Sequence, residues 1–190
     1  MAECKAPIPE AALLDYWAHD LAAGDETERI ETHLFACVDC AARLEHLAAL
    51  GIGLVTLVEQ GRVSGVMTRT ILNRLQRGGA HVRMFSLMPG ETVPCATFPG
   101  DDLVVAALRA DFSGIEAVTL SVTGAGGSPL ARFEDVPVSG PGGEVLWATS
   151  AAVVREMPSM RMEITLASTG ATGGELGRYV LEHHAPAGRS

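Results

Sequence analysis

A histidine and two cysteines in the first quarter of the chain have the types and spacing of ligands for a single metal ion. His33 precedes Cys37 by four residues, so on a helix the two side chains lie on one face, one turn apart. Cys37 and Cys40 form a Cys-x-x-Cys pair, which can present two thiolates to one ion. These side chains supply three of the four soft ligands of a tetrahedral Zn²⁺ site. The sequence therefore predicts a metal centre that organises a short helical bundle.

The fourth ligand must come from another part of the chain. We expect it to be Cys4, with His19 as the alternative. Four protein ligands leave no coordination position for water, so we predict a structural zinc site and a protein that is not an enzyme. The competing hypothesis is a thiol–disulfide oxidoreductase that uses Cys37 and Cys40, because such a pair at a helix start can carry out thiol–disulfide exchange.

The remaining cysteine and the last histidines give weaker signals. Cys95 follows Pro94 in an expected strand, and we interpret it as a small buried apolar residue. His183 and His184 are adjacent, so in a strand they point to opposite faces and cannot readily share an ion. The sequence contains no arrangement typical of a nucleophilic triad or a phosphate-binding loop.

Charge is distributed unevenly over the 190 residues, whose formal net charge is -9. Residues 1–50 have a balance of -7, residues 51–80 of +3 and residues 81–190 of -5. The acidic first part argues against direct nucleic-acid binding, and it either suits a basic partner protein or only keeps the surface soluble. The longest apolar run, 47–58, is interrupted by glycine and short for a bilayer, so we expect a cytoplasmic protein without a membrane segment.

Hydrophobic periodicity predicts helices in the first eighty residues. We expect one helix from Pro9 to Gly24, a second over 26–36 capped by Asp25 with Glu28, and a third from Ala41. These helices define a domain over 1–60. Residues 61–80 follow as an amphipathic helix over 63–75 and a Gly-Gly hinge. Its apolar stripe either binds a partner or packs on the bundle.

The residue pattern changes after residue 80, where short apolar runs alternate with Gly, Pro and Asp. We expect strands at seven places: 81–87, 103–109, 117–122, 130–133, 144–149, 160–167 and 177–182. Their spacing favours an antiparallel β-sandwich or jelly roll over 81–190. The predicted fold class is therefore α+β, a zinc-bound helical bundle followed by a β-domain.

Residues 4–60 resemble the zinc-binding anti-sigma family of bacterial regulators. The resemblance rests on Cys4, on Leu14-Asp15-Tyr16-Trp17, and on Ile30-Glu31-x-His33-Leu34-x-x-Cys37-x-x-Cys40. It implies that Cys4, His33, Cys37 and Cys40 hold the zinc. It also implies a partner, an extracytoplasmic-function sigma factor. The helical bundle would insert between the two DNA-binding regions of that sigma factor. Residues 62–77 would match the helix that wraps the sigma factor and so blocks RNA polymerase.

The resemblance carries further expectations for redox behaviour and for the second half of the chain. In redox-responsive members, oxidation expels zinc and joins the first cysteine to one of the Cys-x-x-Cys pair, here Cys4 with Cys40. Some soluble members carry a C-terminal cupin, and residues 88–94 are faintly similar to a cupin start, but Cys95 and Thr97 replace the expected histidines. We therefore expect a β-sandwich without a cupin metal site, which senses a signal or forms a homodimer. A zinc-stabilised module with a partner other than sigma is the remaining alternative.

Overall fold

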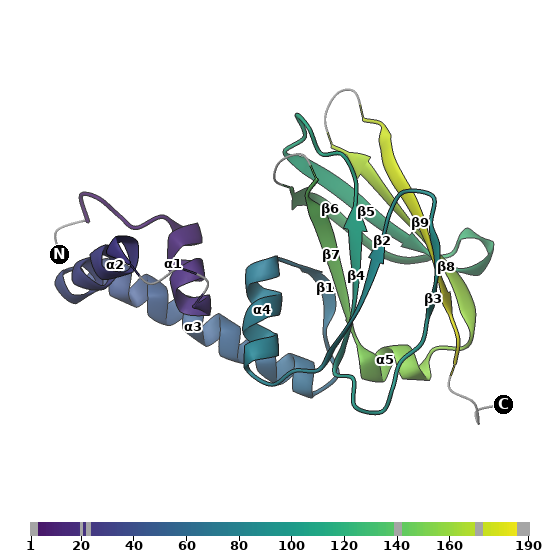
Figure 1. Cartoon of the computed structure of the whole chain (residues 1–190), viewed down its shortest axis with the longest axis horizontal. Helices are drawn as coiled ribbons and strands as arrows, with labels where there is room; N and C mark the ends of the chain where they lie inside the picture. Colours follow the sequence, from purple (N-terminus) through teal and green to yellow (C-terminus); the bar gives the residue numbers. More distant parts are fainter. Residues whose placement is uncertain (1–3, 20, 22–23, 139–141, 170–172, 186–190) are drawn as a thin grey trace. The chain divides into compact units, whose positions relative to one another are not determined.

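The computed structural model describes residues 4–19, 21, 24–138, 142–169 and 173–185, and its architecture is α+β (Figure 1). The chain divides into two compact units. The helical unit comprises residues 1–60 and 69–79, and the β-unit comprises residues 61–68 and 80–190.

The first helix of the helical unit, α1 (Glu10–Ala18), begins directly after Pro9. It ends earlier than the predicted Gly24, because His19 adopts a left-handed conformation (φ 57°). The His19 N–H then bonds to the carbonyls of Asp15 and Tyr16, which satisfies the last turn.

The second and third helices meet at one cysteine. α2 (Asp25–Ala36) opens with three acidic residues in its first turn, where the helix dipole favours negative charge. Gly24 is its cap residue and no side chain caps it, so the predicted pairing of Asp25 with Glu28 is wrong. α3 (Val38–Glu59) begins three residues before the expected Ala41. Cys37 lies between the two helices in an extended conformation.

The expected helix over 63–75 is shorter than predicted and starts later. Residues Ser64–Met67 form the strand β1, which pairs with β7 (Glu144–Ser150), and α4 covers Arg69–Arg77. Val63, Gly65 and Val66 are poor helix formers, so an available strand partner can override their amphipathic spacing.

α4 packs on α1 within the helical unit. Thr70 donates a hydrogen bond to the Asp15 carboxylate at 3.2 Å, and Arg77 donates one to the carbonyl of Ala18. The Arg74 guanidinium lies over the Trp17 ring, 5.2 Å from its centroid. We expected the amphipathic helix either to bind a partner or to pack on the bundle, and the structure shows α4 packed on the bundle.

The β-unit contains two mixed sheets, of strand order β1-β7-β4-β2 and β3-β9-β8-β5-β6. The strands not yet introduced are β2 (Val82–Leu87), β3 (Thr92–Cys95), β4 (Leu103–Arg109), β5 (Ala117–Thr123), β6 (Pro129–Pro137), β8 (Met160–Ser168) and β9 (Glu175–His183). A single 3-10 turn, η1 (Ala125–Gly127), joins β5 to β6, and the helix α5 (Ala151–Glu156) follows β7. All seven predicted runs are strands.

The prediction of purely antiparallel sheets is wrong. β2 pairs with β4 in parallel, and β3 pairs with β9 in parallel. The reason is that β3 belongs to the other sheet, so the chain leaves the first sheet after β2 and returns to it in the same direction as β4. Pairing between segments far apart in sequence leaves no local signal.

A hydrophobic core formed by described residues of both sheets lies inside the β-unit. Alternate residues of β5 (Val118, Leu120, Val122) and of β8 (Met162, Ile164, Leu166) are buried, as the period of a half-buried strand requires. Residues of β4, β7 and β9 join the same cluster, so both sheets contribute to it. Tyr179 is fully buried there, and its hydroxyl donates to the Arg109 carbonyl at 2.7 Å.

Candidate metal centre

Four side chains from three segments of the helical unit converge near the α2–α3 junction. The segment before α1 supplies Cys4, the last turn of α2 supplies His33, and the start of α3 supplies Cys37 and Cys40. Their ligand atoms all lie within 4.8 Å of one another. Cys4 Sγ is 3.5 Å from His33 Nε2 and 4.0 Å from Cys40 Sγ.

Two of these distances are close to those of a tetrahedral zinc site. Zinc–sulfur and zinc–nitrogen bonds of about 2.3 and 2.0 Å place a sulfur about 3.5 Å from a nitrogen and about 3.8 Å from another sulfur. The separation of Cys4 from His33 already has this length, and that of Cys4 from Cys40 requires only a small shift. Three sulfurs and one imidazole nitrogen are also the donor set that zinc prefers over magnesium or calcium.

The thiols at the site differ in their readiness to lose a proton. A hydrogen bond from the Cys40 backbone, with further bonds from neighbouring side chains, lowers the pKa of Cys37 to about 7. The Ala6 backbone acts in the same direction on Cys4, but burial and the nearby Cys37 and Cys40 outweigh it and raise the pKa of Cys4. Several thiolates this close repel each other, and a divalent cation would remove that repulsion.

Packing around the cluster fixes the segment that carries Cys4. Ile8, Leu13, Ile30 and Cys40 are buried together, and Cys4 and Cys37 pack against them. The Arg43 guanidinium on α3 donates to the Ile8 carbonyl at 2.9 Å, which ties this segment to the third helix. The fixed backbone positions the first cysteine opposite the other three side chains.

The structure groups Cys4, and not His19, with the other three predicted ligands. His19 is exposed at the end of α1 and is not part of the cluster. Cys95 is buried in the β-unit, as expected, and burial raises the pKa of its thiol to about 11. His183 is buried and His184 is exposed, in agreement with the opposite faces predicted for them.

Sequence reasoning missed the apolar residues that flank the cluster on its outside. Phe35 and Val38, on either side of Cys37, are 93% and 78% exposed. The sequence does show large apolar residues beside the metal motif, and these could have indicated an exposed apolar surface. The helical periodicity alone did not predict that they are exposed.

Comparison with known proteins identifies no family for this chain. No family model matches it, and no curated protein matches it. Among solved structures, the N-terminal domain of phage TP901-1 ORF48 aligns with 54% of this chain and 98% of its own length, at 11% identity and a TM-score of 0.31. A likeness at this score carries no argument, so the function has to be inferred from the residues of the chain.

Proposed function

We propose that the protein is an anti-sigma factor whose helical unit, held together by zinc, binds and sequesters an extracytoplasmic-function sigma factor. The observation that carries the proposal is the convergence of Cys4, His33, Cys37 and Cys40, the residues on which the family resemblance rests. Zinc would act only as a cross-link here, because four protein ligands complete its shell. Cys4 would thereby fix the start of the chain against α2 and α3.

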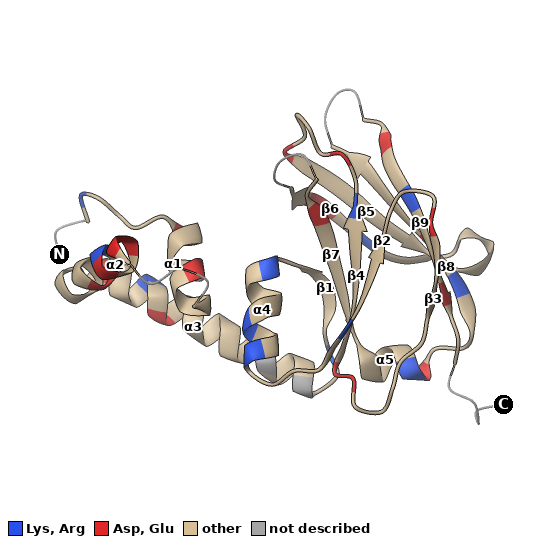
Figure 2. Ribbon diagram, in the orientation of Figure 1, with Lys and Arg blue, Asp and Glu red and all other residues tan. Residues whose placement is uncertain are grey.

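Acidic residues on the helical unit support a basic partner. Figure 2 shows acidic positions gathered on the ribbon of α2, and the sequence of this helix contains Asp25, Glu26, Glu28 and Glu31. Sigma factors bind the DNA phosphate backbone through basic surfaces, so this helix would steer the two proteins together. Such steering makes the association rate fall as salt concentration rises.

Exposed apolar side chains on the same unit would supply the buried contact area. They are Phe35, Val38, Leu50, Ile52 and Leu57, and all are in or beside α3. Ile52 is 67% exposed and Leu50 is 58% exposed, which is unusual for such residues on one helix. A partner that covers them would gain much of its affinity from a few such contacts.

The same helix is long and apolar enough, by length and composition, to cross a membrane over Val38–Val58. We favour partner binding because Asp39, Arg43 and Glu45 interrupt its first turns. The uncharged part, 46–58, would extend about 20 Å at 1.5 Å per residue, which is short of the roughly 30 Å hydrocarbon core. We therefore propose a cytoplasmic location.

For the β-unit we propose a sandwich-like, two-layer arrangement that receives a signal. Its two sheets contribute to one core, which supports this interpretation. No cupin-type metal ligands would be involved, since Cys95 is a buried thiol in the region where such ligands would lie.

Co-purification followed by reconstitution tests the proposal. The tagged, zinc-loaded chain should recover a sigma factor from its own cells, identified by mass spectrometry, and should inhibit transcription by the matching holoenzyme in a purified system. Ile52→Glu should weaken sigma binding at least tenfold, because it places a charge in the proposed contact. Met88→Glu is the matched control, since Met88 is 51% exposed in the β-unit. Equal binding by both variants, or no inhibition by the zinc-loaded protein, would contradict the proposal.

A thiol–disulfide oxidoreductase is the second candidate function. It is favoured by the position of Cys37 directly before α3, with Cys40 in the first turn of that helix. Such an enzyme should reduce a disulfide substrate after chelation of metal, and Cys4→Ser should leave its rate unchanged. Loss of activity in either case would exclude this candidate.

A further inference from the structure

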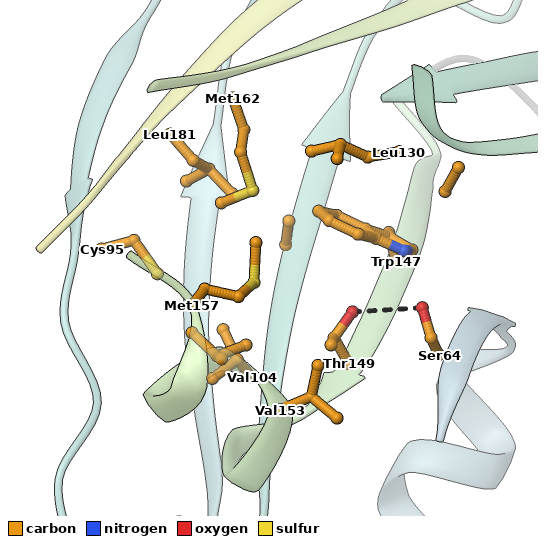
Figure 3. A pocket seen from close by; sticks show the side chains of 13 residues that line it. Ser64, Cys95, Val104, Leu130, Trp147, Thr149, Val153, Met157, Met162 and Leu181 are labelled. Atoms are coloured by element: carbon orange, nitrogen blue, oxygen red, sulfur yellow. Dashed lines mark hydrogen bonds between the residues drawn. The ribbon is translucent and has the colours of Figure 1, made fainter. Parts of the chain in front are cut away.

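The β-unit contains a cavity of about 280 Å³ that the proposed sigma-binding role does not use. It is lined by side chains from both sheets and from α5 (Figure 3). Its walls are mostly aliphatic or sulfur-containing, with Met157 and Met162 facing each other across it. Methionine side chains adapt their shape to a bound molecule, so this lining suits a ligand and not a rigid core contact.

None of the described lining residues carries a charge. The thiol of Cys95 also stays neutral, since burial raises its pKa to about 11. Burying an ion without a partner is costly, so a charged ligand would be rejected. The cavity therefore selects for uncharged, mainly hydrocarbon molecules.

One side of the cavity carries polar groups. Trp147 on β7 forms part of the wall, but its Nε1 is buried and does not face the open space. Thr149 on the same strand and Ser64 on the neighbouring strand β1 place their hydroxyl oxygens 3.5 Å apart, and Figure 3 shows this pair near the nitrogen end of the indole. A pair of hydroxyls uses only one O–H within the pair, so the other O–H could donate a hydrogen bond to a ligand oxygen.

Exposed apolar residues mark where the cavity reaches the surface. Leu130 on β6 is 46% exposed and Val153 on α5 is 43% exposed, and both also line the cavity. A small molecule could therefore enter between β6 and α5 without opening the core. An apolar cavity of about 150 Å³ can bind benzene, so this one has room for about ten non-hydrogen atoms.

We propose that this cavity binds a small, uncharged, mainly hydrocarbon molecule with one hydrogen-bond acceptor, which takes a hydrogen bond from the Ser64–Thr149 hydroxyl pair. Medium-chain ketones have this chemistry. The inference depends only on the β-unit and stands whether or not the helical unit binds a sigma factor.

Calorimetric titration of the full chain with 2-octanone tests the proposal, with octanoate as a charged probe of nearly equal size. We expect saturable one-to-one binding of the ketone and at least tenfold weaker binding of octanoate at neutral pH. Absence of saturable ketone binding, or equal affinity for the two probes, would overturn the proposal.

Two substitutions locate the bound molecule. Thr149→Val keeps the side-chain shape but removes the hydroxyl, so it should weaken 2-octanone binding about three- to tenfold. Thr119→Val, on β5 and outside the cavity lining, is the matched control and should bind as the unchanged protein does. Ala131→Met should fill part of the cavity and reduce binding further, with thermal unfolding showing that the variant folds. Unchanged affinity in both cavity variants would place the ligand elsewhere and refute the assignment.

Discussion

The helical unit and the β-unit differ in the buried clusters that the structure describes. The cluster around the candidate metal ligands has four buried members among the described residues, and one of them, Cys40, is itself a proposed ligand. The cluster inside the β-unit has nineteen buried residues in the described part of the chain, including Tyr179 and Phe112. A small cluster is commonly reinforced by a metal or a disulfide, so we expect the fold around Cys40 to depend on metal and the fold of the β-unit not to. The comparison therefore predicts a metal-dependent unit beside a metal-independent one.

Replacing one cysteine in each unit should reveal the largest difference between the two units. Cys40→Ala removes a ligand, and because structural zinc contributes about 10 kcal/mol or more, α2 and the start of α3 should lose their amide-exchange protection. β4 and β8 should keep theirs. Cys95→Ala is the matched control, since it removes a buried thiol from the β-unit and should leave metal content unchanged. Retained protection of α2 in the Cys40 variant would mean that the units do not differ in this way.

Oxidation should act on the helical unit alone. Hydrogen peroxide would take two electrons from the zinc-bound thiolates of Cys4 and Cys40 and two protons from the solvent, forming one disulfide and two waters, and the metal would be released. Their sulfurs are 4.0 Å apart, so little movement is needed. Cys95 should remain reduced, because it is buried and its pKa is about 11. Peptide mapping and a zinc indicator measure both events; a metal that stays bound under excess peroxide would contradict the expectation.

Truncating a buried side chain in the core of the β-unit should destabilise that unit only. Ile164→Ala truncates a fully buried side chain on β8 and should lower the free energy of unfolding by about 2–5 kcal/mol. Denaturant unfolding measures this change, and the zinc content should remain that of the unchanged protein. Loss of metal in this variant would show that the stability of the two units is linked.

The smallest expected effect comes from one ion pair in the β-unit. Arg83 Nε lies 2.6 Å from Asp101 Oδ2. Burial alone would raise the pKa of Asp101, but hydrogen bonds from Arg83 and the Phe98 backbone outweigh it and lower that pKa. The ionised carboxylate therefore stabilises the unit above the unfolded pKa, and this contribution is lost as pH falls through the folded pKa. Asp101→Asn should cost about 1–2 kcal/mol at pH 7 and less at pH 2 in denaturant unfolding. An equal loss of unfolding free energy at both pH values would exclude the ionised Asp101 carboxylate as the source of this stability.

The sequence was most informative where the relevant spacing is local. His33, Cys37 and Cys40 lie within eight residues, so helical geometry alone predicts that they meet. Seven strands were predictable because apolar residues alternate between turn signals. The structure then placed Cys4, the distant member, beside the other three.

Features made by distant segments could not be predicted. β1 forms because residues 64–67 find a partner in β7, eighty residues away, and this pairing overrides their helical pattern. The parallel pairs β2–β4 and β3–β9 have the same non-local origin. The cavity is lined by side chains from both sheets and α5, so no single stretch of sequence carries its signal.

Native mass spectrometry of the full chain, purified without added metal chelators, tests the central claim most directly. The account predicts one zinc ion per chain in the unchanged protein, and none in the Cys37→Ser/Cys40→Ser double variant. A metal-free mass for the unchanged protein, with α2 still protected from amide exchange, would contradict it.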